Sequence, residues 1–171
     1  MHLNNKQRGV GLVEVLAALF VLSVGLLGIA GLQAQGLIAG FNASQRSVAV
    51  VKAYEIIERM RSNPDAVNDG LGTTAYATAM SGPGAAPGVY CADNAGNPGD
   101  NCNEVQLATF DIFAWKQSID NAFPGMSGMG SVQVTLGPVA TSPTNVIVTV
   151  QWTERGVVQQ YSTNTQFVRV Q

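Results

Sequence analysis

Histidine is almost absent from this chain, because the only one is His2, near the N-terminal end. A Ser-His-Asp triad, a Cys-His pair and a histidine-bound metal all require this side chain, so its scarcity argues against these sites. A phosphate-binding loop is also missing, because Gly82-Pro83-Gly84 follows no expected strand and precedes no lysine. We therefore expect no enzymatic activity and no cofactor.

Charge is scarce as well. Charged residues make up 12% of the chain, with 9 basic and 11 acidic side chains and a formal net charge of −2. The chain has no basic patch that would favour nucleic acid as a partner. Asp93, Asp100 and Glu104 could offer oxygen ligands to Ca²⁺, but their spacing is not that of an EF-hand loop, so we expect no metal site.

One long stretch has no charge at all. No charged side chain stands between Glu14 and Arg46, and Ser23 is the only polar residue from 15 to 32. A helix of about 20 apolar residues crosses the hydrocarbon core of a membrane and satisfies its own backbone hydrogen bonds there. We therefore predict a membrane-spanning helix over residues 10–41.

The start of this helix carries a specific pattern. A short basic leader with Lys6 and Arg8 ends at Gly9, the apolar run begins at Val10, and Glu14 follows just inside it. A carboxylate in hydrocarbon is costly, so it should have a partner or a purpose. The two basic residues before the span predict a cytoplasmic N-terminus, with the rest of the chain on the other side of the membrane.

This pattern resembles the type IV prepilins, whose leader ends in Gly and whose mature chain has Glu at position five. The resemblance implies that a prepilin peptidase cleaves after Gly9 and N-methylates the Val10 amine, which then pairs with Glu14 of a neighbouring subunit. The sequence departs from the usual Phe-Thr-Leu-x-Glu text, since Val10 and Gly11 replace Phe and Thr, while Leu12 and Glu14 are kept.

Two simpler interpretations of the N-terminus exist. A secretory signal has an apolar core of about 7–15 residues with its cleavage site after the core. Here the apolar run is longer and Gly9 precedes it, which argues against such a signal. An uncleaved anchor of an unrelated periplasmic domain is the second alternative.

The two cysteines, Cys91 and Cys102, lie in a segment rich in Gly, Asn and Asp. In an oxidising periplasm this pair should form a disulfide, whereas two free thiols would suit a cytosolic protein. A zinc site would need two more ligands of the same kind, and none cluster here. Closing so short a loop should stabilise the fold by about 3 kcal/mol.

The helical pattern continues past the membrane to Ser62, where Asn63-Pro64-Asp65 predicts its end. In this second half Ser47, Val50, Tyr54 and Ile57 share one face, which we expect to cover a sheet. Residues 64–103 have the composition of a loop, and we expect a partner-binding surface there. The text from Tyr54 to Asn63, with its Glu-Arg-Met-Arg run, resembles minor pilins of the PilV type.

A second helix and a sheet should follow. Asn103 and Gln106 have the spacing of a capping box before an apolar helix over 107–123, whose text at 111–116 again resembles PilV-type pilins. Alternating residues then predict strands around 132–136 and 146–152, and a tight turn at 154–156 leads into the last strand. This order predicts an α+β protein with the type IV pilin fold, a long N-terminal helix packed on an antiparallel β-meander.

We therefore hypothesise a minor type IV pilin of the PilV type with a leader at 1–9, a membrane and assembly helix at 10–41 and a periplasmic domain at 42–171. The resemblance implies an inner-membrane protein that later enters the pilus. It also implies partnership with other minor pilins, the major pilin, the prepilin peptidase and the inner-membrane assembly platform, in support of adhesion, twitching motility or DNA uptake. Two alternatives are a minor pseudopilin of a type II secretion system and a membrane-anchored periplasmic binding module.

Overall fold

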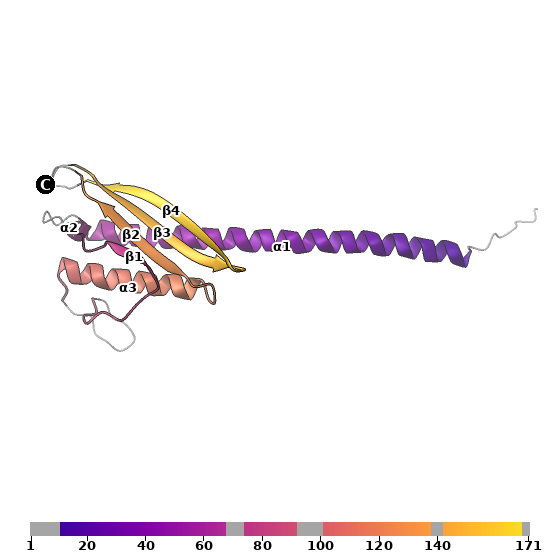
Figure 1. The fold of residues 1–171 in the computed structure, drawn as a ribbon, viewed down its shortest axis with the longest axis horizontal. Helices are drawn as coiled ribbons and strands as arrows, with labels where there is room; N and C mark the ends of the chain where they lie inside the picture. Colours follow the sequence, from indigo (N-terminus) through magenta and orange to yellow (C-terminus); the bar gives the residue numbers. More distant parts are fainter. Residues whose placement is uncertain (1–10, 68–73, 92–100, 138–141, 169–171) are drawn as a thin grey trace, which may run out of the picture. The chain divides into compact units, whose positions relative to one another are not determined.

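The structure is a computed structural model that describes residues 11–67, 74–91, 101–137 and 142–168. The expected leader at 1–9 and the processing residues Gly9 and Val10 lie outside this range. The elements follow one another in the order α1 (Leu12–Ser62), α2 (Pro64–Val67), β1 (Thr78–Ser81), α3 (Glu104–Ala122), β2 (Met129–Thr135), β3 (Thr144–Glu154) and β4 (Val157–Phe167) (Figure 1). The chain divides into two compact units, up to Ala43 and from Ser44 onward.

The first unit is the apolar part of α1. The sequence permits an uninterrupted helix here because, from its first turn to Ser62, it contains no proline, and its many leucines and alanines are strong helix formers. Ser23 does not interrupt the helix, because its hydroxyl donates to the Phe20 carbonyl at 2.8 Å. The helix ends at Ser62, as predicted, immediately before Asn63 and Pro64.

The second unit contains a four-stranded antiparallel sheet with the strand order β1-β2-β3-β4 (Figure 1). Eleven residue pairs join β3 to β4 without interruption, from Thr144 with Phe167 to Glu154 with Val157. The connecting turn at Arg155 and Gly156 has φ of 50° and 79°, the left-handed conformation of a two-residue hairpin. The predicted α+β fold, a long helix followed by an antiparallel meander, is therefore confirmed.

The core of this unit lies between one face of the sheet and the two long helices. Alternate β3 residues face it, and they are Val146, Val148, Val150 and Trp152. The side of α1 that contributes to the core consists of Ala49, Ala53, Ile56, Ile57 and Met60. The predicted face was wrong in part, because Tyr54 is 49% exposed. The small side chains of Ala49 and Ala53 are what α1 buries there instead.

Helix α3 begins with the predicted capping box. The Gln106 backbone N–H donates to Asn103 Oδ1 at 2.9 Å, and the Asn103 N–H donates to Gln106 Oε1 at 3.0 Å. These two bonds satisfy N–H groups that a helix start would otherwise leave unpaired. The helix then buries Trp115 and Ile119 in the core, and Gly130 on β2 lets both side chains approach the sheet closely.

The prediction of a plain loop over 64–103 was wrong for several of its residues. The short helix α2 buries Ala66 and Val67, and Tyr76 is completely buried in the core. Thr78–Ser81 form the edge strand β1. Helix α2, Tyr76 and strand β1 therefore belong to the folded domain, whereas residues 82–91 contain no helix or strand and none of them is buried, as the loop prediction requires.

Candidate functional site: the apolar helix and the disulfide-bonded region

The apolar part of α1 has the length and composition needed to cross a membrane. Its most apolar 18-residue window has a mean hydropathy of 2.6 and no buried residue, and it is the only such helix among the described residues. The large side chains from Leu12 to Phe41 are exposed to different degrees around the whole helix. A helix that is apolar on all sides is stable only inside a membrane or against other apolar surfaces.

Glu14 is the one charged residue of this unit among the described residues. It lies in the first turn of α1, and its backbone N–H donates to the Gly11 carbonyl at 2.9 Å. The positive end of the helix dipole favours a carboxylate at this position. The Glu14 side chain is exposed, so it is free to meet a group from outside the chain.

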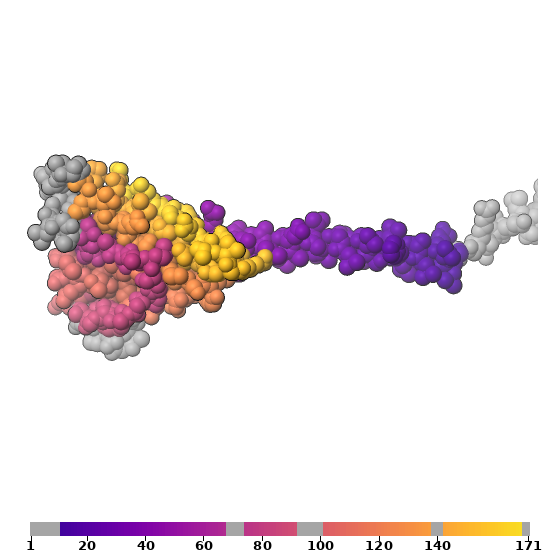
Figure 2. Space-filling view, viewed as in Figure 1, coloured from indigo at the N-terminus to yellow at the C-terminus, as the bar shows by residue number. Residues whose placement is uncertain are grey.

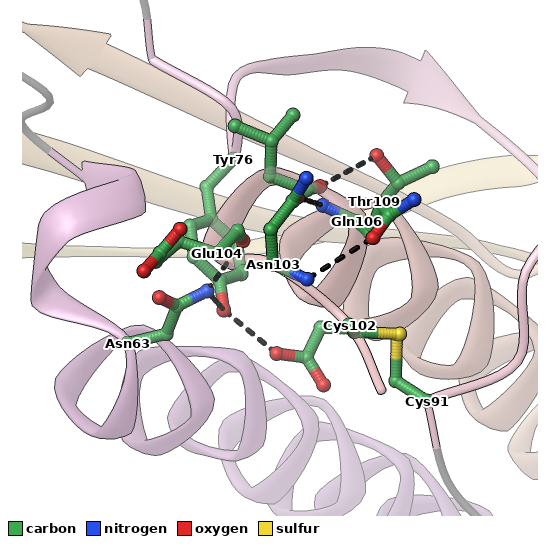
Figure 3. Close-up of a disulfide and its surroundings, with 10 residues drawn as sticks. Asn63, Tyr76, Cys91, Cys102, Asn103, Glu104, Gln106 and Thr109 are labelled. Carbon is green, nitrogen blue, oxygen red and sulfur yellow. Dashed lines mark hydrogen bonds between the residues drawn. A yellow bond between two sulfur atoms is a disulfide. The ribbon is translucent and has the colours of Figure 1, made fainter. Parts of the chain in front are cut away.

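A disulfide joins Cys91 to Cys102, with a Cα–Cα distance of 5.6 Å (Figure 3). The predicted disulfide is therefore confirmed. Cys102 directly precedes the capping residue Asn103, so the crosslink fixes the chain at the start of α3. Tyr90, next to Cys91, meets Phe110 of α3 edge-on, with 6.0 Å between ring centroids. The Cys91 side of the crosslink is thus held against the same helix.

Asn63 connects the end of α1 to this region. Its side-chain amide donates to the Glu104 carbonyl at 2.8 Å and to the Tyr76 hydroxyl at 3.3 Å (Figure 3). The Tyr76 hydroxyl in turn donates to Asp111 Oδ2 at 2.7 Å. The residue that follows the α1 terminus therefore contacts both the first turn of α3 and the buried tyrosine.

An ion-pair network joins α1 to α3. Arg59 binds Asp111 Oδ1 at 2.9 Å and Glu55 Oε1 at 3.1 Å, and Lys52 binds Glu55 Oε2 at 2.9 Å. Trp115 strengthens the same junction, because its indole N–H donates to the Lys52 carbonyl at 2.7 Å. Both Tyr54–Asn63 and 111–116, the two stretches that resemble PilV-type pilins, take part in these contacts.

The network changes the acidity of its members. Burial alone would raise the pKa of Glu55, but the hydrogen bonds and charges of Lys52 and Arg59 outweigh it and lower that pKa. Burial would likewise lower the pKa of Arg59, and the bonds to Asp111 and Glu55 raise it instead. Burial and the adjacent Asp111 carboxylate raise the pKa of Tyr76, so its hydroxyl remains a proton donor. At neutral pH Glu55 is therefore ionised, Arg59 is charged and Tyr76 is neutral.

Lys116 lies apart from this network. It is only 4% exposed, and its ammonium donates to Thr78 Oγ1 at 2.8 Å, to the Ala79 carbonyl at 2.9 Å and to Ser81 Oγ at 2.6 Å. Its three protons therefore have three acceptors, all of them on β1. Burial lowers the pKa of this amine.

Two shallow pockets, each of about 220 Å³, lie beside α3, and Pro87 and Thr109 line both of them. Their walls are mostly apolar, and Lys116 is the one ionisable residue among the described lining residues. Among the described residues no three His, Cys, Asp or Glu side chains gather into a group that could hold a metal ion. Asp93 and Asp100 lie outside that part of the chain.

Comparisons with protein families agree with this architecture. Residues 4–30 match the prokaryotic N-terminal methylation motif, and residues 31–113 match the model of the type IV pilin Tt1218. The chain is a type IV pilin. Neither a curated protein nor a solved structure matches it significantly. Pilins are structural, non-enzymatic proteins, and membership implies processing by a prepilin peptidase and assembly with other pilins.

The apolar helix and the disulfide of this pilin were predicted from the sequence. The ion-pair network between α1 and α3 was not. Arg59 and Asp111 are far apart in the chain. The residues around each of them do not indicate that the two side chains form an ion pair. Lys116 was also missed, because its acceptors lie on a strand that the composition of 64–103 concealed. The processing residues Gly9 and Val10 and the assembly residue Glu14 stay predictions.

Proposed function

We propose that this pilin is a minor subunit of the PilV type that helps to prime pilus assembly in a complex with other minor pilins at the fibre tip. The observation that carries the proposal is the apolar part of α1, which has no charged residue between Glu14 and Arg46 and matches the methylation motif at its start. A subunit with such a helix can be stored in a membrane and then transferred into the apolar centre of a filament. The change of environment costs little, because both surroundings are apolar.

The contact between the two PilV-like stretches supports the minor-pilin assignment. The Glu-Arg-Met-Arg run and the segment 111–116 meet through the Arg59–Asp111 ion pair at 2.9 Å. Asp111 is 6% exposed, so loss of Arg59 would leave a nearly buried carboxylate without its cation. The two stretches that resemble PilV-type pilins thus contain the residues that attach α3 to α1.

The proposal includes the layout of the mature protein. Residues 1–9 are a leader that the peptidase removes after Gly9, residues 10–41 span the inner membrane, and residues 42–171 form the periplasmic domain. The N-terminus is cytoplasmic before assembly. The disulfide supports a periplasmic location of the second unit, because disulfides persist in oxidising compartments.

Glu14 acts in assembly in this proposal. Its carboxylate binds the N-methylated Val10 amine of a neighbouring subunit, and the pairing sets the axial register of the two helices. The free energy needed to bury this neutralised pair in an apolar filament is lower than that needed to bury an isolated carboxylate.

Intact-mass and N-terminal analysis of the protein purified from its native membrane tests the processing step. We expect a chain that starts at N-methylated Val10. A chain that still starts at Met1 would contradict the pilin pathway and leave an uncleaved anchor.

Glu14→Ala tests the assembly step. We expect the variant to reach the membrane, to be cleaved at Gly9, and to be lost from sheared pili by at least about tenfold, the equivalent of 1.4 kcal/mol in partitioning. Ser23→Ala is the matched control, because the Ser23 hydroxyl donates to the Phe20 carbonyl of its own helix. Normal incorporation of Glu14→Ala into pili would contradict the assembly role of Glu14. Absence of the wild type from sheared pili, with function intact in Glu14→Ala, would favour the anchored binding module. Retention of the wild type in the envelope with a secretion defect on deletion would favour the pseudopilin.

A further inference from the structure

The two edges of the sheet are built differently. β1 forms one edge and β4 the other, because the strand order is β1-β2-β3-β4. An exposed edge presents unpaired N–H and C=O groups, and proteins normally protect it with short strands, irregular pairing, proline or a charged side chain, especially lysine. The presence or absence of such protection therefore distinguishes a closed edge from one that can accept another strand.

The β1 edge is protected in several ways. β1 has only four residues, and its pairing with β2 shifts register between Thr78 and Ser81. The Lys116 ammonium binds two hydroxyls of β1 and the Ala79 carbonyl, so one of the backbone acceptors of the strand is already occupied. A second chain would have to displace a buried cation to pair there.

The β4 edge has none of these features. β4 extends over eleven residues, pairs with β3 in unbroken register, and contains no charged residue and no proline. No backbone hydrogen bond joins the β4 residues to any described residue other than those of β3. Figure 2 shows this strand, in yellow, at the surface.

The hairpin geometry identifies the groups that point off this edge. The Thr153 N–H donates to the Met126 carbonyl at 2.6 Å, so it points away from β4. Thr153 opposes Val158, and this pair is therefore not hydrogen-bonded. Hydrogen-bonded and non-hydrogen-bonded pairs alternate along antiparallel strands, so every second N–H of β4 is free at the edge. These N–H groups belong to Val158, Gln160, Ser162, Asn164 and Gln166.

We propose that the β4 edge pairs with a β-strand of a different pilin subunit and so extends the sheet from one protein to the next. The inference rests on the proposed function for the identity of the partner as a pilin. It adds the surface on which that partner binds. The free N–H and C=O groups repeat every second residue, and only an extended chain can match this spacing.

The side chains of β4 define the chemistry of the partner strand. Tyr161 and Phe167 are on the core side of β4, where they are partly buried against the core. The opposite side of β4 carries no formal charge and is polar apart from Val158, with Gln160, Ser162, Asn164 and Gln166 after it. The best partner is therefore a strand with apolar residues on the core side and uncharged polar residues on the other. Such a strand would cover the exposed parts of Tyr161 and Phe167.

The closed β1 edge also excludes one possible partner. A second copy of this chain could extend the sheet head to tail only by adding its β1 to β4, and β1 is already occupied by Lys116. Such a heterologous contact would otherwise repeat without closing and produce a homopolymer. One open and one closed edge instead suit a subunit that occupies a single place in a mixed complex.

Hydrogen exchange tests the proposal directly. The full chain is purified in detergent, alone and in complex with the other pilins isolated from the same cells, and exchange is followed across β4 and β1. In the complex we expect exchange at the five free β4 amides to slow by at least about tenfold, while β1 does not change. Unchanged β4 exchange in an intact complex would overturn the proposal.

A proline at Asn164 provides an independent test, because its N–H points off the edge and an edge strand tolerates proline there. We expect Asn164→Pro to lower recovery of the complex by at least about tenfold with a small change in Tm, and Asn164→Ala to leave both unchanged. Normal recovery with a folded Asn164→Pro protein would contradict the inference. Thr165→Pro should unfold the domain, because its N–H pairs with β3.

The outcomes separate this inference from the proposed function. If β4 becomes protected in the protein alone as its concentration rises, two copies pair through β4 and the assignment to a different subunit is wrong. If the chain assembles normally into pili while β4 exchanges freely, only the edge contact is wrong. If the chain is neither processed nor assembled with pilins, the proposed function itself fails.

Discussion

Adding a single methyl group at Gly130 should destabilise the periplasmic domain measurably. Gly130 lies on β2, where α3 crosses the sheet. A Cβ atom at this position would lie 2.5 Å from Trp115 Cη2, 2.7 Å from Trp115 Cζ3 and 2.8 Å from Ile119 Cδ1. These separations are far below van der Waals contact, so α3 or the sheet must move in the Gly130→Ala variant.

The magnitude follows from how tightly Trp115 is held. Its ring is completely buried, and its N–H is fixed to the Lys52 carbonyl at 2.7 Å, so rotation of the ring would break a buried hydrogen bond. Overpacking of this kind costs about 1–3 kcal/mol. In a domain of this size each kcal/mol corresponds to about 4 °C, so Tm should fall by roughly 4–12 °C.

The assay is thermal unfolding of the full chain in detergent, followed by near-UV circular dichroism of Trp115 and Trp152. Both tryptophans are buried in the second unit, so the signal reports on that unit and not on the apolar helix. Gly82→Ala is the matched control, because a Cβ there meets nothing within 4 Å. We expect its Tm to equal that of the wild type.

A second substitution tests the proposed cause. Ile119→Val removes the Cδ1 atom that lies 2.8 Å from the added methyl group. Combined with Gly130→Ala, it should cost less than the sum of the two single changes. If Gly130→Ala unfolds within about 0.5 kcal/mol of the wild type, the close packing of α3 on β2 described above is wrong.

Three further predictions concern the disulfide and the ion-pair network. Cys91→Ser should lower the stability of the domain by about 3 kcal/mol, and a reducing agent should shift the Tm of the wild type equally but not that of the variant. Tyr76→Phe should cost about 1–2 kcal/mol in denaturant unfolding, because Asp111 loses a buried hydrogen-bond donor at 2.7 Å. Glu55 has a folded-state pKa below its ordinary value of 4.5, so its contribution is present above pH 4.5 and is lost as the pH falls through the folded-state pKa. Stability measured against pH should therefore fall less steeply in acid for Glu55→Gln, and an unchanged slope would contradict this role.

Features that depend on neighbouring residues could be predicted from the sequence. The end of α1 before Pro64, the capping box at Asn103 and the hairpin at Arg155 each arise from a few consecutive residues whose backbone preferences agree. The apolar helix was predictable for the same reason, since length and composition alone decide whether a helix can cross a membrane. The disulfide followed from the compartment that this helix implies.

Features that depend on distant contacts could not be predicted. The buried side of α1 uses Ala49 and Ala53, whose small size matters only because other elements approach there, whereas hydrophobicity favoured Tyr54. Strand β1 has four unremarkable residues, and Lys116 contacts it from more than thirty positions away. Strand β1 is defined by its pairing with β2, which the residues of β1 alone do not indicate.

The disulfide lets the sequence between Cys91 and Cys102 change in length without a change in the rest of the fold. Cys91 and Cys102 hold the ends of the intervening segment 5.6 Å apart, and the Asn103 capping box continues directly into α3. Lengthening a closed loop is cheap, since doubling its length costs about 0.6 kcal/mol. New sequence can therefore enter between the two cysteines while α3 keeps its starting point. The same property makes this segment a suitable insertion point for an epitope or fluorescent label that follows the pilin during assembly.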